Sequence, residues 1–247
     1  MKSLWLYTIG ACIFTTSHAQ HISFGVDGAV SQNTQLFYNP QKPEDGTTQL
    51  NWMTGFNAGI FARCNNIFGE SRKSRTTLKT SLTYFRKGSS MPYQSMAPLY
   101  PGVVPGATQM PTINNDKARS TLDYLTLNLV FQTRLMQVGE FSLIGDAGFG
   151  NNLLLRSDIE GGKLDPIRNG YPFDIYNDHT IRRYNLAYIL GLEIRSVKGY
   201  SLFIQTNQSM SPVFISGNLR VKDWSWIYGL SVDMVHYRFH KGFNPAR

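Results

Sequence analysis

The sequence predicts an all-β protein: an eight-stranded antiparallel up-and-down transmembrane β-barrel of the smallest outer-membrane size class, preceded by a cleaved signal peptide. Three features predict this fold: a secretory leader, eight short segments in which apolar and polar residues alternate, and connections that alternate between long and short. Alternation with a period of two indicates a β-strand whose two faces meet different surroundings. Alternating long and short connections are typical of barrels that cross a membrane.

The first nineteen residues have the character of a signal peptide. Lys2 supplies a positive start, an apolar stretch covers 4–14, and Ser17-His18-Ala19 places small residues near the expected cleavage point. The apolar stretch is too short for a membrane-spanning helix. We therefore divide the chain into a signal peptide, 1–19, and a barrel domain, 20–247. An alternative reading places a lipoprotein cleavage box at 9–12.

Cysteine and charge exclude several classes of function. Cys64 is the one cysteine left after cleavage at Ala19, so no intrachain disulfide is expected. The chain has no C-x-x-C or H-E-x-x-H spacing, and we expect no metal ion and no cofactor. The net charge is +8, but the basic clusters at 72–75 and 182–183 are not interleaved with aromatic residues. We therefore expect no nucleic-acid partner and place these clusters near anionic lipid headgroups.

The first four strands are expected at about 21–30, 51–62, 76–86 and 121–133. In each, apolar side chains share one face, while mostly small or polar residues occupy the other. The apolar faces comprise, in order, Ile22, Phe24 and Val26; Trp52, Phe56 and Ile60; Leu78, Leu82 and Tyr84; and Leu125, Leu127, Leu129 and Phe131.

The last four strands are expected at about 140–155, 184–194, 200–209 and 224–239. The sixth has the most regular alternation of the chain. The apolar faces comprise Phe141, Leu143 and Phe149; Tyr184, Leu186, Tyr188, Leu190, Leu192 and Ile194; Leu202 and Ile204; and Trp224, Trp226, Tyr228, Leu230 and Val232.

The connections fall into two groups. Three are compact, at about 63–75, 134–139 and 196–199, and four are longer, at about 31–50, 87–120, 156–183 and 210–223. In an outer-membrane barrel the short turns face the periplasm and the long loops face outside, so both termini are expected in the periplasm.

The polar faces decide between a membrane barrel and a soluble one. A soluble lipocalin-like barrel has an apolar lumen and a charged exterior. Here the polar faces consist mainly of Gly, Ser, Asn, Ala and Thr, which suits a narrow lumen inside an apolar, lipid-facing wall. Aromatic residues near the strand ends are expected to form girdles at the membrane surfaces. They are Trp52, Tyr84, Tyr124, Tyr184, Trp224 and Trp226.

Two strands and the C-terminal region carry a family resemblance. Residues 124–132 (YLTLNLVFQ) resemble the "YLEIPLLLKY" strand of the PorT-like outer-membrane β-barrels of Bacteroidota, and 141–148 (FSLIGDAG) resemble their "YxxAGP" strand. Residues 237–239 are similar to the terminal aromatic strand that barrel-assembly machinery recognises, although a tail follows at 240–247. The departures from the two motifs are Thr126, Asn128, Asp146 and Ala147. The resemblance implies the fold and an outer-membrane location, and it raises a role in protein secretion.

Six charged residues are expected to point into the lumen. Because an isolated buried charge is costly, they should pair with one another and close the barrel as an internal network. A proton or ion path is the alternative. The six are Asp27, Lys79, Asp146, Glu193, Arg195 and Asp233.

An enzymatic function receives little support from the sequence. Lipid hydrolases built on barrels need a His and a Ser on the lipid-facing surface with an acidic or amide orienting group. The nearest candidate is Asn207-Gln208-Ser209, where Asn stands at the His position, and His236 and His240 have no clear serine partner. We expect no enzymatic activity.

The long loops offer a binding surface for an extracellular ligand or a protein. Their aromatic side chains could make contacts or could fold back over the barrel mouth. The candidates are Tyr93, Tyr100, Tyr171, Phe173 and Tyr176. The sequence thus predicts a structural or interaction component of the cell envelope, integral to the outer-membrane lipid. The alternative is a subunit or assembly factor of a secretion system, with envelope or secretion-system proteins as partners.

Overall fold

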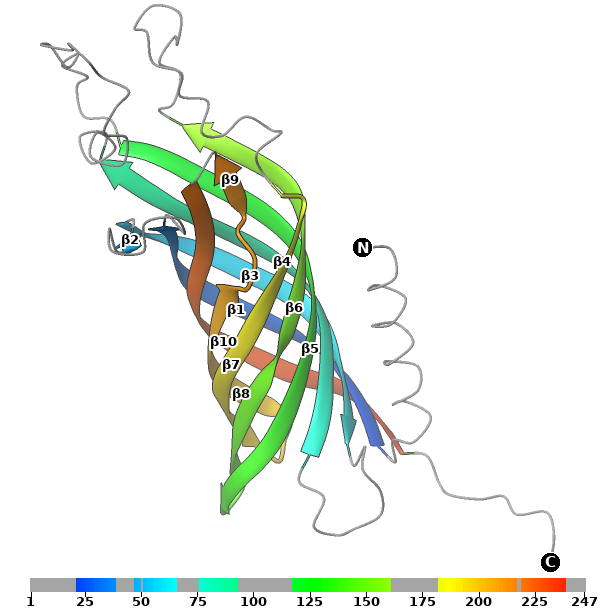
Figure 1. Ribbon diagram of the computed structural model, residues 1–247. Coiled ribbons are helices and arrows are strands. Elements are labelled where there is room, and N and C mark those ends of the chain that lie inside the picture. Colours follow the sequence, from blue (N-terminus) through cyan, green and yellow to red (C-terminus); the bar gives the residue numbers. More distant parts are fainter. Residues whose placement is uncertain are drawn as a thin grey trace, which may run out of the picture.

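A computed structural model describes residues 21–38, 47–49, 51–65, 76–92, 117–160, 182–216 and 219–238. These residues form one antiparallel sheet that closes on itself (Figure 1). Eight long strands build the wall, and β1 pairs with both β3 and β10, which closes the barrel. The strands are β1 (His21–Tyr38), β3 (Asn51–Asn65), β4 (Thr76–Pro92), β5 (Lys117–Val138), β6 (Phe141–Glu160), β7 (Tyr184–Ser196), β8 (Tyr200–Ser209) and β10 (Leu219–Arg238).

Two short strands extend one end of the barrel. β2 (Thr47–Gln49) pairs with the end of β1, and β9 (Phe214–Ser216) pairs with the start of β10. We call this the loop end, because the connections predicted to be long leave the barrel here. Among the described residues there is no helix long and apolar enough to cross a membrane.

The opposite end, the turn end, holds two tight turns. Gly139 and Glu140 link β5 to β6, and 197–199 link β7 to β8. Gly139 has φ +57° and Gly199 has φ +88°, in the region that glycine enters without a steric penalty. His21 pairs with Arg238, so the first and last described residues lie side by side at this end.

Burial in this barrel is inverted relative to a soluble protein. Polar side chains such as Ser31, Asn152 and Ser225 are buried inside, while large apolar side chains are exposed outside. Each of the eight long strands contributes to the exposed apolar wall. Examples, in strand order, are Val26, Ile60, Leu82, Phe131, Phe149, Leu190, Leu202 and Leu230.

The predicted fold class is confirmed, and the main difference lies in strand length. β1 continues to Tyr38 and β4 to Pro92, whereas the sequence pattern ends these strands at about residues 30 and 86. β3 likewise extends three residues past position 62, to Asn65. The apolar face ends before the hydrogen-bonded ladder does, so the pattern underestimates the strands. The predicted signal peptide, 1–19, lies outside the described residues.

Candidate functional site

The turn-end half of the lumen holds an ion cluster centred on Arg63. The Arg63 guanidinium donates to Glu193 Oε1 at 2.9 Å, to Ser231 Oγ at 3.1 Å, and also to Asp233. Arg63 and Glu193 are 1% and 0% exposed, so this pair is removed from water. Such a pair is stable only when several hydrogen bonds satisfy both partners.

Neutral side chains complete the ion cluster. Arg195 donates to Glu193 Oε1 at 2.9 Å and to Gln132 Oε1 at 2.7 Å. The Gln132 amide donates to Glu193 Oε2 at 2.7 Å and to Asp146 Oδ1 at 3.0 Å, and Gln205 donates to the other oxygen of Asp146 at 2.8 Å. β3, β5, β6, β7, β8 and β10 all contribute, so the cluster ties the barrel together across its diameter.

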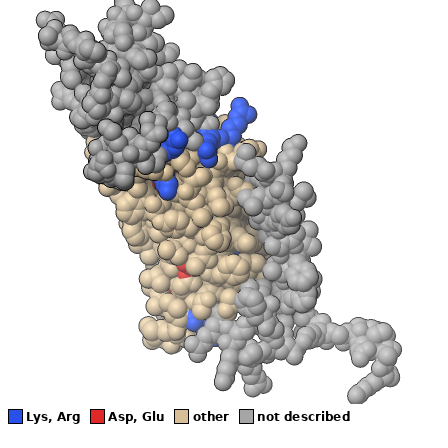
Figure 2. All heavy atoms as spheres, viewed as in Figure 1, with Lys and Arg blue, Asp and Glu red and all other residues tan. Residues whose placement is uncertain are grey.

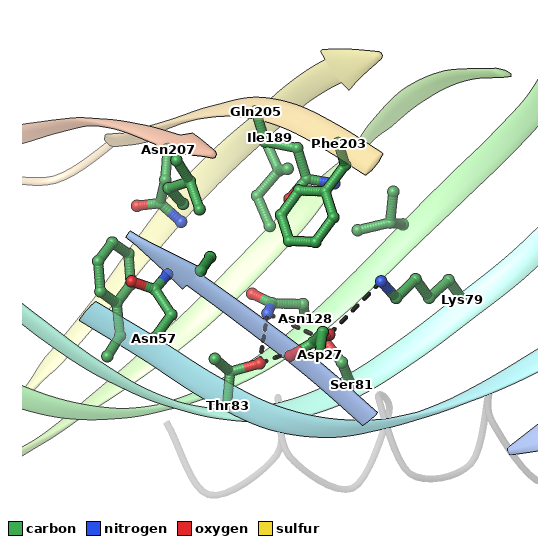
Figure 3. A pocket seen from close by; sticks show the side chains of 14 residues that line it. Asp27, Asn57, Lys79, Ser81, Thr83, Asn128, Ile189, Phe203, Gln205 and Asn207 are labelled. Atoms are coloured by element: carbon green, nitrogen blue, oxygen red, sulfur yellow. Dashed lines mark hydrogen bonds and ion pairs between the residues drawn. The ribbon is translucent and has the colours of Figure 1, made fainter. Parts of the chain in front are cut away.

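Above the ion cluster, Lys79 crosses the middle of the lumen (Figure 3). Its ammonium lies 3.5 Å from Asp27 Oδ2 and over the rings of Phe61 and Phe203, at 4.5 and 5.4 Å from their centroids. The neighbouring cavity has a volume of about 40 Å³, which leaves room for only a few water molecules. The side-chain oxygens of Asn57 and Asn128 line it and have no hydrogen-bond partner among the described residues, so water is their natural partner.

The loop-end half of the lumen is filled mainly by an apolar plug. Buried polar side chains surround it in a hydrogen-bond network, in which the Gln35 side-chain oxygen accepts from the hydroxyls of Ser89 and Ser120 at 2.7 and 3.2 Å. Lys87 donates to Asn207 Oδ1 at 2.8 Å, and Gln35 donates to Asp223 Oδ1 at 3.2 Å. The apolar plug consists of Phe85, Leu122, Tyr124, Val213, Val221 and Ile227.

A wider opening lies at the turn end. Its volume is about 320 Å³, and Arg134, Arg195, Asp233 and His236 are among the residues that line it. The ion cluster forms its floor, since Arg195 and Asp233 belong to both. The space inside the lumen thus narrows from about 320 Å³ at the turn end to about 40 Å³ in the middle.

All six charges expected in the lumen are brought into it, although in two groups. Glu193, Arg195, Asp233 and Asp146 join the ion cluster, and Lys79 pairs with Asp27.

The sequence reasoning missed Arg63, which pairs with two carboxylates of the ion cluster. The pattern assigns position 63 to a turn, although it continues the inward alternation of Asn57, Gly59 and Phe61. That continuation is the signal that could have found it.

Tyr124 corrects one part of the aromatic prediction. The sequence predicts it in a membrane-surface girdle, but it is fully buried in the lumen, and its hydroxyl donates to Asp223 at 3.5 Å. Tyr124 lies inside because side chains alternate between the two faces of a strand, so Tyr124 shares the inward face with Thr126. The other five predicted residues lie on the outer wall near the loop end. The rings of Trp52 and Trp224 are 5.6 Å apart, and those of Trp224 and Trp226 are 6.2 Å apart.

A second group of exposed aromatic residues, not predicted, lies near the turn end. Phe24 and Tyr237 make an edge-to-face contact at 6.1 Å, and Phe141 and Tyr200 are also exposed. Between the two aromatic groups the described wall carries almost no charge on the face seen in Figure 2.

The candidate hydrolase residues that the structure describes are engaged with other partners or lie apart. Ser209 is buried and accepts a hydrogen bond from Asn185 Nδ2 at 2.8 Å, and Asn207 is engaged by Lys87. Gln208 accepts from the Tyr188 hydroxyl. His236 is exposed at the turn end, while His240 and the loop residues Tyr93, Tyr100, Tyr171, Phe173 and Tyr176 lie outside the described residues.

No protein-family model matches the chain, and no curated protein matches it. The PorT-like likeness of 124–132 and 141–148 therefore stays a resemblance in sequence. The strand pairing of this chain establishes its fold by itself.

Several solved structures are similar to the chain at low identity. One is Ail, the attachment invasion locus protein of Yersinia pestis, in complex with the heparin analogue sucrose octasulfate (13% identity, TM-score 0.40, 88% of this chain and 99% of that chain). Another is Neisserial surface protein A (11%, TM-score 0.42, 86% and 99%). A third is the outer membrane enzyme PagL (9%, TM-score 0.33, 83% and 99%).

Proposed function

We propose that the chain is a non-enzymatic outer-membrane β-barrel with a lumen closed by its own side chains. It acts as a structural or interaction component of the cell envelope through its extracellular loops. The observation that carries the proposal is the inverted burial: an exposed apolar wall on every long strand around a polar lumen. In water such a wall would aggregate, whereas in a bilayer it meets lipid.

The height of the apolar wall supports a membrane location. Trp226 in the loop-end aromatic group and Tyr237 in the turn-end group are eleven residues apart on β10 (237 − 226). At about 3.3 Å per residue and a tilt of about 40°, this separation corresponds to a height of about 28 Å. Membrane barrels have apolar bands of about 25 Å between two aromatic girdles.

The packed lumen supports a non-conducting role. The ion cluster, the Lys79–Asp27 pair and the apolar plug succeed one another along the axis, and the cavity between them measures about 40 Å³. Because the described side chains fill most of the lumen, we place the interactions of the protein on its outer surfaces. The periplasmic side is assigned to the turn end and the outside to the loop end, in keeping with the turn lengths.

The first test separates the barrel from a soluble protein. The full-length protein should sediment with outer membranes, resist carbonate extraction, and migrate differently in gel electrophoresis before and after boiling. Recovery in the soluble periplasmic fraction would contradict the proposal.

The second test addresses the interaction role. Partners are recovered from mildly solubilised membranes with the native chain and with a variant in which the five loop aromatics (93, 100, 171, 173 and 176) become serine. A partner that is lost with the variant supports loop-mediated interaction, and identical recovery contradicts it. Stable recovery of secretion-machine subunits would favour the alternative that the PorT-like resemblance raised.

A further inference from the structure

Five cations lie near the loop end of the described strands. Arg156 lies near the loop end of β6, Arg182 and Arg183 precede β7, and Arg220 and Lys222 begin β10. We call these five residues the basic collar. Figure 2 shows Lys and Arg gathered towards the loop end of the described surface, above a nearly uncharged wall.

Backbone hydrogen bonds bring the basic collar together from segments distant in sequence. The amide of Leu154 donates to the carbonyl of Arg183 at 2.8 Å, and the amide of Arg182 donates to the carbonyl of Val213 at 2.9 Å. The amide of Val213 donates in turn to Val221, between Arg220 and Lys222, at 2.7 Å. Three strand spacings of about 4.8 Å therefore separate β6 from β10, and the collar spans about 15 Å.

The two β10 cations of the basic collar face outward rather than into the lumen, and its other three cations are exposed. Val221 and Asp223 are buried inside, so alternation places Arg220 and Lys222 on the outer face of β10 together with Trp224. The Lys222 ammonium lies 5.4 Å from the centroid of the Tyr38 ring. Cations thus lie directly beyond an aromatic group, at the level where lipid headgroups begin.

Three cations of the basic collar, Arg156, Arg182 and Arg183, have little opposite charge paired with them in the described part of the chain. Arg156 pairs with Asp158 at 3.1 Å, but both side chains are at least half-exposed (68% and 50%), so the pair is weak. No ion pair joins Arg182 or Arg183 to another residue that the structure describes. At the turn end, by contrast, the exposed turn charges are of mixed sign, with Glu140 in one turn and Lys198 in the other.

We propose that the basic collar binds the phosphate groups of a phosphorylated glycolipid in the outer leaflet of the membrane. Four of its five cations are arginines, whose planar guanidinium groups match phosphate oxygens in pairs. The aromatic side chains of Tyr184 and Trp224 lie beside the sugar–acyl boundary of such a lipid. The inference rests on the proposed outer-membrane location and adds a lipid class and a site to it.

The test measures binding of diphosphoryl lipid A to the full-length protein in detergent, from the rise of the thermal unfolding midpoint with lipid concentration. Arg182→Gln with Arg183→Gln should weaken apparent affinity roughly tenfold or more. Lys198→Gln with Arg134→Gln removes the same charge at the turn end and should leave affinity unchanged. Arg156→Gln with Lys222→Gln provides a second collar variant if the first fails to fold.

Two further probes identify the ligand chemistry. Dephosphorylated lipid A should bind at least tenfold more weakly than the diphosphoryl form, and inorganic phosphate alone should not compete at equal concentration. Any one of three results would overturn the proposed phosphate site. These are equal affinity of both collar variants and wild type, equal binding of dephosphorylated lipid A, and full competition by inorganic phosphate. Failure of the outer-membrane proposal is distinguishable, because the protein would then lack the boiling-dependent shift in gel mobility before any lipid is added.

Discussion

In the turn-end half of the lumen Arg63 pairs with two carboxylates. In the loop-end half Lys87 donates to the side-chain oxygen of Asn207 and lies over the aromatic rings of Phe85 and Tyr124. The turn-end half is filled by the ion cluster, in which Arg63, Glu193 and Asp146 each have at least two partners. The loop-end half is filled by the apolar plug together with hydrogen-bonded polar groups such as Gln35 and Asp223. The difference shows that one narrow barrel can fill its lumen either with paired charges or with apolar packing. The two solutions should respond differently to substitution.

The largest effect is expected for Arg63→Met. The substitution leaves Glu193 and Asp233 buried without their main partner, so the free energy of unfolding should fall by about 3–5 kcal/mol. Guanidinium titration of the protein refolded in lipid vesicles measures it. Adding Glu193→Gln to Arg63→Met should recover part of the loss, because the second substitution removes an uncompensated charge. A loss below about 1 kcal/mol for Arg63→Met would mean that the ion cluster does not hold the turn-end half.

Leu122→Ala tests the apolar plug. Leu122 is fully buried against the plug, so the truncation should cost about 2–4 kcal/mol through lost burial and a residual cavity. Leu122→Met conserves volume and should cost less than about 1.5 kcal/mol in the same titration. Equal losses for the two variants would argue against tight packing at the loop end.

Replacing both buried charges of the loop-end half together should change the free energy of unfolding little. Lys87→Met with Asp223→Asn removes two desolvated charges, while the amide oxygen introduced at position 223 can still accept from Gln35 and Tyr124. The free energy of unfolding of the double variant should lie within about 1 kcal/mol of wild type. A loss as large as that of Arg63→Met would erase the distinction between the two halves.

The smallest effect is expected outside the lumen. Arg156→Gln breaks an exposed ion pair with Asp158 and should change the free energy of unfolding by less than about 0.5 kcal/mol. The change should stay within this limit at both low and high salt concentration. Guanidinium titration of the vesicle-refolded variant at low and high ionic strength measures this change in the free energy of unfolding. A change above about 1 kcal/mol would show that charge contributes to stability outside the lumen as well.

The sequence predicts the barrel better than it predicts the contents of its lumen. Apolar alternation reports the lipid-facing length of a strand, so it locates all eight long strands but ends several of them too early. Arg63 and Lys87 lie just past those early ends, which is why neither is expected in the lumen. The prediction for Tyr124 is wrong because it rests on the aromatic residue type. The alternation of side chains along the strand places position 124 on the inward face. Contacts such as Gln132 with Glu193 join strands that are not neighbours, and no local pattern encodes them.

The closed lumen is tested most directly by electrical recording. Purified full-length protein is inserted into planar lipid bilayers, and insertion is verified by the boiling-dependent gel shift of the same sample. The packed ion cluster and apolar plug predict a membrane current at background level at moderate voltage. Reproducible conductance steps well above background, abolished by omitting the protein, would contradict a lumen sealed by its own side chains.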